Sequence, residues 1–525
     1  MNFEKPFLFL LVFFSISTII SLWSLYFFRF SPLIFVISLA VSFLVIKKVE
    51  LKLPKISTSA ILLCVLVAFL AAYPYFLITP FVDASADPAA HISTLAIGNT
   101  MPETYAPFSE LEYRYQIGFP LLAKMFIDLL PFVSSNFIVW GLGVLFAFIS
   151  AVLIYLISKE IFKDEKYGLI GLALFIGSKI IFQNMYWGQY TFMLASVFFL
   201  ACFLAFYKKS FLAFLFFPMI FIAHPGVAFY SLIFFILWVV VFKNFKEVFK
   251  LFLSGLLVLP AFFISYIHFL SNIGAEESAA FTIGSFFHNA LIFPLWVGLL
   301  IFTLAIIAII WVLVKKEFTK INIFFILVFI VSGLISVFFS ATGRVMGGRI
   351  IELAMFSGLL LGVLLIKKLL GIHPKISKHV LVFLFIISIA LFFTSGQLNY
   401  LRSGSKITQD EIDFAYEFKN FDPEYKKTIF LIDHSTKVAE LSQKIPFDVM
   451  SGWYLSYDKR IIGDDSFYSE LVKNHKLAEN VRHTQCIECI RNIDFYYIVT
   501  DNDYFSSTPG LEKIFEYPPY TVFSK

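Results

Sequence analysis

Long, uninterrupted apolar runs recur along this chain from residue 6 to residue 382 and beyond. A run of about 18 or more apolar residues with few charges is long enough to cross the hydrocarbon core of a bilayer as a helix. Of the 525 residues, 59% are hydrophobic and only 15% are charged, whereas about 25% are charged in soluble domains. We therefore predict an all-α polytopic membrane protein, with lipid as the solvent of most of the chain.

Run length predicts thirteen transmembrane helices. We expect them at 6–28, 32–46, 58–78, 136–157, 168–182, 190–207, 211–223, 227–242, 248–270, 291–314, 321–340, 350–366 and 379–395. The first run is too long for a cleaved signal peptide and lacks a small-residue cleavage site, so we expect it to be retained. Several runs are short for a bilayer, and a pair such as 211–223 and 227–242 could form one bent hairpin.

Lysine is concentrated in alternate loops between the predicted helices. These lysines are Lys47, Lys48, Lys52, Lys55, Lys159, Lys163, Lys166, Lys208, Lys209, Lys243, Lys246, Lys250, Lys315, Lys316, Lys320, Lys367, Lys368, Lys375 and Lys378. Because Lys and Arg favour cytoplasmic loops, this bias places the N-terminus in the cytoplasm and, after an odd number of helices, the C-terminus outside. We read the net charge of +5 as a topology signal, and expect a plasma-membrane location and no nucleic-acid partner.

Composition divides the chain into two parts. Residues 1–398 form the predicted transmembrane domain, with a long external loop at 81–135, and residues 399–525 form a small extracytoplasmic α/β domain. In that domain Thr408 and Glu411 have the spacing of a capping box, which predicts a helix that ends near Phe421. Further helices are expected at 435–443 and 466–481, and strands at 428–432, 495–499 and 520–523.

The four cysteines give no strong functional signal. Cys64 and Cys202 lie in predicted transmembrane helices, where a free thiol usually acts as a packing residue. Cys486 and Cys489 form a single CxxC in the external domain. A zinc site would need two more ligands and a redox motif would need a thioredoxin-like setting, so a local disulfide or two free thiols also fit.

Acidic residues gather at the start of the long external loop. Asp83, Asp87 and His91 recur every four residues and would share one face if this stretch is helical. Asp87 before Pro88 is also a strong signal for the start of a helix, which explains Asp87 alone without any function. The alternative is chemical: a carboxylate here could act as a general base or, with its neighbour, bind a divalent cation such as Mg²⁺ or Mn²⁺.

The loop resembles a segment of a known superfamily. The residues are Asp87, Pro88, Ala89, Ala90 and His91, then Gly98, Asn99, Thr100, Met101 and Pro102, then Tyr113, Arg114, Tyr115, Gln116, Ile117, Gly118, Phe119 and Pro120. This pattern is similar to the first external loop of GT-C superfamily glycosyltransferases, which starts with one or two acidic residues after a transmembrane helix. Many members have a second acidic residue where this chain has Pro88, so the resemblance points to Asp87, helped by Asp83.

The resemblance implies a GT-C-like hexosyltransferase, similar to mannosyltransferases. Such an enzyme moves a sugar from a polyprenyl- or dolichyl-phosphate donor to a protein, lipid or glycan acceptor on the outer face of the membrane. It implies Asp87 as the base, Asp83 and His91 as residues that shape the site, and Tyr113 and Arg114 as contacts for donor or acceptor. If such an enzyme binds a divalent cation, the resemblance implies Asp83 and Asp87 as its ligands.

External turns supply further candidate residues. Gln189 follows a Trp-Gly pair similar to a recurrent turn of such enzymes, although an interfacial aromatic belt looks the same. His224 precedes Pro225 and resembles a His-Pro of related sequences, although a histidine in a helix-breaking turn is an equally simple explanation. Arg344 and Arg349 form a close basic pair that could hold the donor phosphate. Their alternative partners are Glu352 and lipid phosphate.

Two other functions remain open from the residues. A transporter or flippase of lipid-linked sugars would share the membrane architecture, but it would usually show ionisable groups and broken helices near the middle of the bilayer. A receptor-like protein would depend on residues 399–525 and not on Asp87. The polar residues outside the predicted helices favour the transferase.

Overall fold

The computed structural model describes most of the chain. The described residues are 3–27, 31–49, 51, 53–78, 104–105, 108–112, 117–133, 135–178, 184–185, 189–259, 282–342, 346–372, 377–394, 408–424, 426–432, 438, 442, 444–446, 495–501, 505–506 and 508–524.

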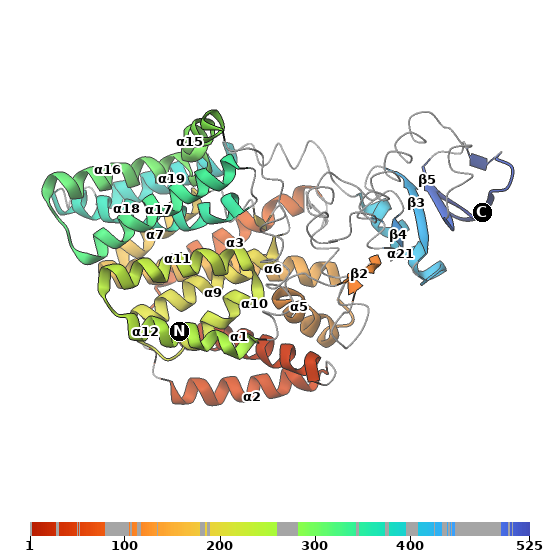
Figure 1. Cartoon of the computed structure of the whole chain (residues 1–525), viewed down its shortest axis with the longest axis horizontal. Coiled ribbons are helices and arrows are strands. Elements are labelled where there is room, and N and C mark those ends of the chain that lie inside the picture. The colour runs from red at the N-terminus through yellow and green to blue at the C-terminus, as the bar shows by residue number, and fades with distance from the viewer. Residues whose placement is uncertain are drawn as a thin grey trace.

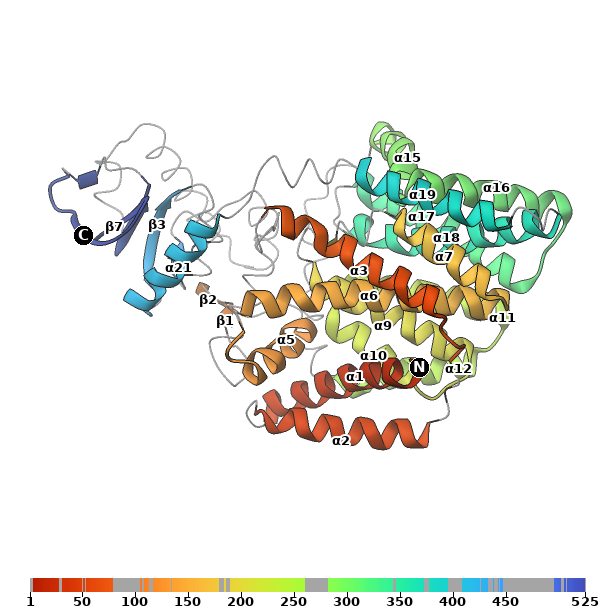
Figure 2. The ribbon, with the colours of Figure 1, turned by 180° about the vertical axis from the view of Figure 1, so that it is seen from behind.

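A bundle of apolar helices makes up the first part of the chain (Figures 1 and 2). Its helices are α1 Glu4–Phe27, α2 Leu33–Lys48, α3 Thr58–Ile78, α5 Gly118–Leu129, α6 Ser135–Phe162, α7 Glu165–Ile176, α9 Tyr190–Tyr207, α10 Ala213–Ala223, α11 Pro225–Phe242, α12 Phe245–Ser254, the 3₁₀ helix η1 Gly255–Val258, α15 Ile283–Val297, α16 Leu299–Lys315, α17 Lys320–Ala341, α18 Met346–Ile372 and α19 Ser377–Thr394. The membrane architecture predicted from the apolar runs is thus confirmed at this level.

The number of spans differs from the sequence-based expectation. Within the described part of the chain, six helices are long and apolar enough to cross a membrane, or seven if the bent pair α15 and α16 forms one span. Shorter apolar stretches lie at Thr58–Tyr73 within α3, at Ala213–Ala223, which is α10, and at His379–Phe393 within α19. The predicted count of thirteen is therefore not confirmed.

The helix predicted at 291–314 is not continuous. Residues 291–314 were expected to form a continuous span, but the chain breaks at Gly298 and the two helices meet at an angle of 102°. Gly298 has a φ of +97°, a conformation that residues with a Cβ rarely adopt. Pro294 lies inside α15, one turn before this break.

The segment 81–135, predicted to be an external loop, contains elements that its sequence did not predict. Strands β1 Thr104–Tyr105 and β2 Phe108–Glu112 pair antiparallel, and helix α5 follows at Gly118–Leu129. The first eight residues of α5, Gly118 to Met125, are all buried, whereas its last turn is partly exposed. The last part of this segment is therefore an integral piece of the helical body.

Lysine-rich loops meet at one end of the bundle. Lys159 Nζ donates to the carbonyl of Lys55 at 2.5 Å, and Lys208 Nζ lies 3.0 Å from a carboxylate oxygen of Glu160. These contacts join the segment before α3 to the C-terminal ends of α6 and α9. Their clustering fits the expected cytoplasmic side, and the orientation in the membrane stays a prediction.

Aromatic rings form the core between α9, α11 and α18. Phe199 and Phe203 of α9 each lie 5.1 Å, centroid to centroid, from the ring of Phe234 of α11 in edge-to-face geometry. Both also lie 5.8 Å from the ring of Phe356 of α18. Edge-to-face pairs contribute about 0.5–1.5 kcal/mol beyond burial. This cluster fixes the three helices against one another along their length.

The second part of the chain is a small α/β unit. Helix α21 Gln409–Phe421 precedes a five-stranded sheet in the order β4-β3-β5-β7-β6, where β3 pairs parallel with β4 and β5, and β7 pairs antiparallel with β5 and β6. The strands are β3 Lys427–Leu431, β4 Ile445–Pro446, β5 Tyr497–Thr500, β6 Glu512–Tyr517 and β7 Tyr520–Ser524.

Local sequence signals place several of these elements correctly. The capping box of Thr408 and Glu411 starts α21, and three strands were predicted within two residues of their bounds. Strands β4 and β6 were not predicted. The helix expected at 466–481, most of the helix expected at 435–443, and Cys486 and Cys489 lie outside the described residues.

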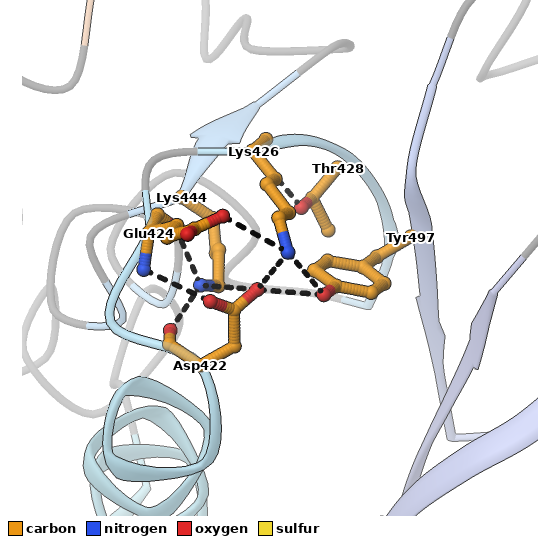
Figure 3. A network of polar contacts seen from close by, with 6 residues as sticks. All are labelled: Asp422, Glu424, Lys426, Thr428, Lys444 and Tyr497. Atoms are coloured by element: carbon orange, nitrogen blue, oxygen red, sulfur yellow. Dashed lines mark hydrogen bonds and ion pairs between the residues drawn. The ribbon is translucent and has the colours of Figure 1, made fainter.

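A charged network ties the end of α21 to the sheet (Figure 3). Tyr497 OH donates to Asp422 Oδ2 at 2.6 Å, and Lys426 Nζ lies 3.1 Å from that oxygen. The Glu424 amide donates to Asp422 Oδ1 at 2.9 Å. Lys444, fully buried, donates to the carbonyls of Asp422 and Glu424. Burial alone would raise the pKa of Asp422, but the hydrogen bonds from Tyr497, Glu424 and Lys426 outweigh it and lower the pKa to about 2.

The network predicts an acid-sensitive domain. Because the pKa of Asp422 is about 2 in the folded state against an ordinary 3.8, the ionised carboxylate stabilises the fold above about pH 4. That stabilisation is lost as the pH falls toward 2. Asp422→Asn should lower the free energy of unfolding by about 2 kcal/mol at pH 5, in line with a hydrogen bond to a charged group.

This stability can be measured between pH 2 and pH 5 by pepsin digestion of the full chain in lipid at a series of urea concentrations. The release of peptides from β5 reports unfolding of the domain. Glu417→Gln, an exposed change on α21, is the control and should behave as wild type. An equally steep loss of resistance below pH 4 in Asp422→Asn and wild type would contradict the assignment.

Candidate functional site

Three helices begin side by side at the end of the bundle opposite to the lysine-rich loops. Gln189 immediately precedes α9, His224 immediately precedes α11, and Arg349 lies in the first turn of α18. Arg349 Nη1 donates to Gln189 Oε1, and its guanidinium lies 4.9 Å from the centroid of the Phe192 ring. Three residues singled out separately from the sequence are thus brought together around Phe192.

His224 caps helix α11 and also contacts this cluster. Its Nδ1 accepts a hydrogen bond from the amide of Gly226 at 3.0 Å, and its ring meets Phe192 edge to face at 5.1 Å. His224 thus lies in a turn between two helices, which is the simpler explanation that the sequence offered, and its capping of α11 is an addition from the structure. Since Nδ1 is an acceptor, the neutral imidazole carries its hydrogen on Nε2 and keeps one donor for a further partner.

Glycine allows the close approach of α11 and α18 at this point. A Cβ at Gly226 would lie 3.2 Å from Cβ of Arg349 and 3.1 Å from the His224 ring. Both distances are tighter than side-chain contacts normally are, so a larger residue would require His224 and Arg349 to shift by a few tenths of an ångström.

The electrostatics of the cluster favour an anion. The N-terminal end of each helix carries a partial positive charge of roughly +0.5, and an arginine in a first turn adds to that charge. Arg349 donates to the neutral amide of Gln189, which leaves its charge in place, and the carboxylate that interacts with it electrostatically is Glu352, buried one turn deeper in α18. Helix N-termini combined with a guanidinium form an arrangement that binds phosphate or carboxylate groups.

Glu352 lies one turn further along α18, buried inside the bundle. Its Oε2 accepts hydrogen bonds from Ser196 Oγ at 2.6 Å and Tyr230 OH at 2.9 Å, and its Oε1 accepts one from Asn184 Nδ2 at 3.2 Å. The pairing of Glu352 with Arg349 that the sequence suggested is not a hydrogen bond: the two side chains bond to different partners but still interact electrostatically. A carboxylate inside a predicted span was the signal that could have singled it out.

The start of α5 packs next to this cluster. A Cβ at Gly118 would lie 2.9 Å from Cα of Ala223, the residue before His224. The ring of Phe119 lies 5.5 Å from the ring of Tyr190, the first residue of α9. Gly118 and Phe119 therefore lie beside the starts of α11 and α9.

The remaining candidate residues are not covered by the structure. Asp83, Asp87, His91, Tyr113, Arg114 and Arg344 lie outside the described residues, so their roles stay predictions. Among the described residues, no group of three or more His, Cys, Asp or Glu side chains is placed to hold a metal ion. Because Asp83 and Asp87 are not among them, the predicted divalent cation is untested.

Comparison with known proteins does not assign the chain to a family. The sequence matches no protein-family model and has no significant similarity to any curated protein. Function has to be argued from the site itself.

Proposed function

We propose that this protein is an integral membrane glycosyltransferase that uses a polyprenyl-phosphate-linked sugar as donor. The observation that carries the proposal is Arg349 at the meeting point of three helix N-termini, bonded to a neutral amide. A lipid-linked donor keeps its phosphate at the membrane surface and its chain in the bilayer. A phosphate site at the ends of transmembrane helices is suited to such a molecule.

The proposed reaction is a transfer of the sugar from phosphate to an acceptor hydroxyl or amide. The acceptor atom forms a bond to the anomeric carbon, the bond from that carbon to the phosphate oxygen breaks, and the phosphate keeps the electron pair. Asp87 takes the acceptor proton, with Asp83 and His91 shaping its surroundings. Arg349, together with Arg344, stabilises the charge that develops on the leaving phosphate.

Residues near the cluster have supporting roles in this proposal. The free Nε2–H of His224 can donate to a phosphate or sugar oxygen, and Gln189 orients the guanidinium of Arg349. Tyr113 and Arg114 precede Gly118, which packs beside His224. They are therefore assigned to contacts with donor or acceptor.

Transport of a lipid-linked sugar is the second candidate. Two observations favour it: Glu352 is a buried ionisable group among apolar helices, and the helices α15 and α16 are broken by 102° at Gly298. Intramembrane ionisable residues and discontinuous helices are typical of transporters. The two functions differ in whether a bond in the donor is broken.

The test is transfer of radiolabelled sugar by the purified protein in lipid vesicles, with a panel of polyprenyl-phosphate sugars and a mixture of peptide, lipid and glycan acceptors. We expect labelled acceptor with at least one donor, and a repeat with chelator decides the metal requirement. Movement of intact labelled donor across the bilayer without transfer would refute the transferase and favour the transporter.

A further inference from the structure

A small cavity lies inside the bundle beside Glu352. It has a volume of about 30 Å³ and is lined by residues of α6, α7, α9, α11 and α18. Its polar lining consists of Ser150, Ser196, Tyr230 and Glu352, and the rest of the lining is apolar. One water needs about 10–15 Å³ of such space and two to four polar partners. The cavity meets both requirements.

Ser150 on α6 is the unusual member of this lining. Its side chain is only 2% exposed, and its Oγ has no hydrogen-bond partner among the described residues. Ser42 and Ser357, by contrast, are buried serines whose hydroxyls donate to carbonyls of their own helices, that of Ser38 at 2.6 Å and that of Leu353 at 2.9 Å. A buried hydroxyl without any partner costs about 1–3 kcal/mol.

The other side of the cavity offers hydrogen-bond acceptors. The hydroxyl hydrogen of Tyr230 is directed to Glu352, and the single hydroxyl hydrogen of Ser196 is taken by Glu352 or by the carbonyl of Phe192. What both hydroxyls present to a further partner is therefore oxygen lone pairs. A water molecule can donate two hydrogens to such acceptors and accept the hydrogen of Ser150 Oγ. One water would therefore satisfy the hydroxyl on α6 and the carboxylate cluster on α9, α11 and α18 together.

We propose that this cavity is a built water site that links Ser150 to the Glu352 cluster. The water completes the hydrogen bonds of a carboxylate and of a hydroxyl that would otherwise be buried at a cost. It also joins α6 to the three helices whose ends form the anion site. The proposal does not depend on the glycosyltransferase function.

Ser158 provides a matched control on the same helix. It lies two turns further along α6, is fully buried, and its Oγ also has no partner within the described part of the chain. Ser158 does not line the cavity. Removing a hydroxyl that is bonded to water costs stability, whereas removing one that is truly unpaired is neutral or favourable.

The first experiment compares the apparent Tm of Ser150→Ala and Ser158→Ala with that of wild type, using the full chain in lipid nanodiscs. We expect Ser150→Ala to lower the Tm by about 2 °C and Ser158→Ala to leave it unchanged or raise it. Equal effects of the two variants, or a higher Tm for Ser150→Ala, would show that the cavity is dry and overturn the proposal.

A double-mutant cycle tests the link itself. Ser150→Ala and Glu352→Gln should be non-additive, because both act on the same water, while Ser158→Ala and Glu352→Gln should be additive. Additive effects in both cycles would show that Ser150 and Glu352 are not linked through a water, and would refute the proposal. A sodium ion could occupy the cavity instead of water. In that case the Tm of wild type would rise with NaCl but not with KCl, and Ser150→Ala and Glu352→Gln would not show this rise. That result would also overturn the water site.

Discussion

Asp87→Asn should reduce sugar transfer by about 100- to 10,000-fold, the usual contribution of a general base. Asparagine keeps the size and the helix-capping ability of aspartate but cannot accept the proton of the acceptor. The substitution therefore separates the chemical role of Asp87 from its local structural role. The expected pattern is a lower kcat with little change in the KM of the donor, since the base acts on the acceptor.

The measurement is transfer of radiolabelled sugar in vesicles at saturating donor. Asp128→Asn, in α5 and paired with Lys124 at 3.2 Å, is the control and should keep wild-type activity. Transfer by Asp87→Asn at the wild-type rate would rule out Asp87 as the base. In a transporter, the same variant would leave translocation of intact donor unchanged.

Arg349→Ala should reduce transfer by about 100- to 1,000-fold, because it removes a preorganised positive charge from the leaving phosphate. Both kinetic constants should change: the KM of the donor rises because the phosphate is held less tightly, and kcat falls because the charge on the phosphate grows in the transition state. Arg349→Lys should recover part of the loss, since lysine keeps the charge but not the planar fork.

Gln189→Ala separates positioning from charge at the same site. It removes the acceptor that holds the guanidinium, so its effect should be smaller than that of Arg349→Ala and should have the same kinetic signature. The Tm of each variant in nanodiscs shows whether the bundle is intact, because Arg349 also packs over Phe192. Full activity of Arg349→Ala in an intact bundle would refute the phosphate assignment.

The sequence alone determined the elements that depend on local chemistry. Helices α3 and α9 have the bounds that the apolar runs at 58–78 and 190–207 predicted, because the transfer of apolar side chains into lipid depends on run length. Helix α21 starts at its predicted capping box, because a capping box involves residues only three apart. Lysine-rich loops were predicted on one side, and they meet at one end of the bundle.

Only the tertiary structure decided which of these elements meet. Gln189, His224 and Arg349 are separated by 35 to 160 positions in the chain, and no local pattern states that α9, α11 and α18 begin at one point. The same holds for Glu352, whose partners come from α9, α11 and the segment at Asn184. The break at Gly298 was also missed, because an apolar run has the same composition whether its helix is straight or bent. Run length and capping are local properties of the chain, whereas the site depends on packing between distant helices, which the sequence does not state residue by residue.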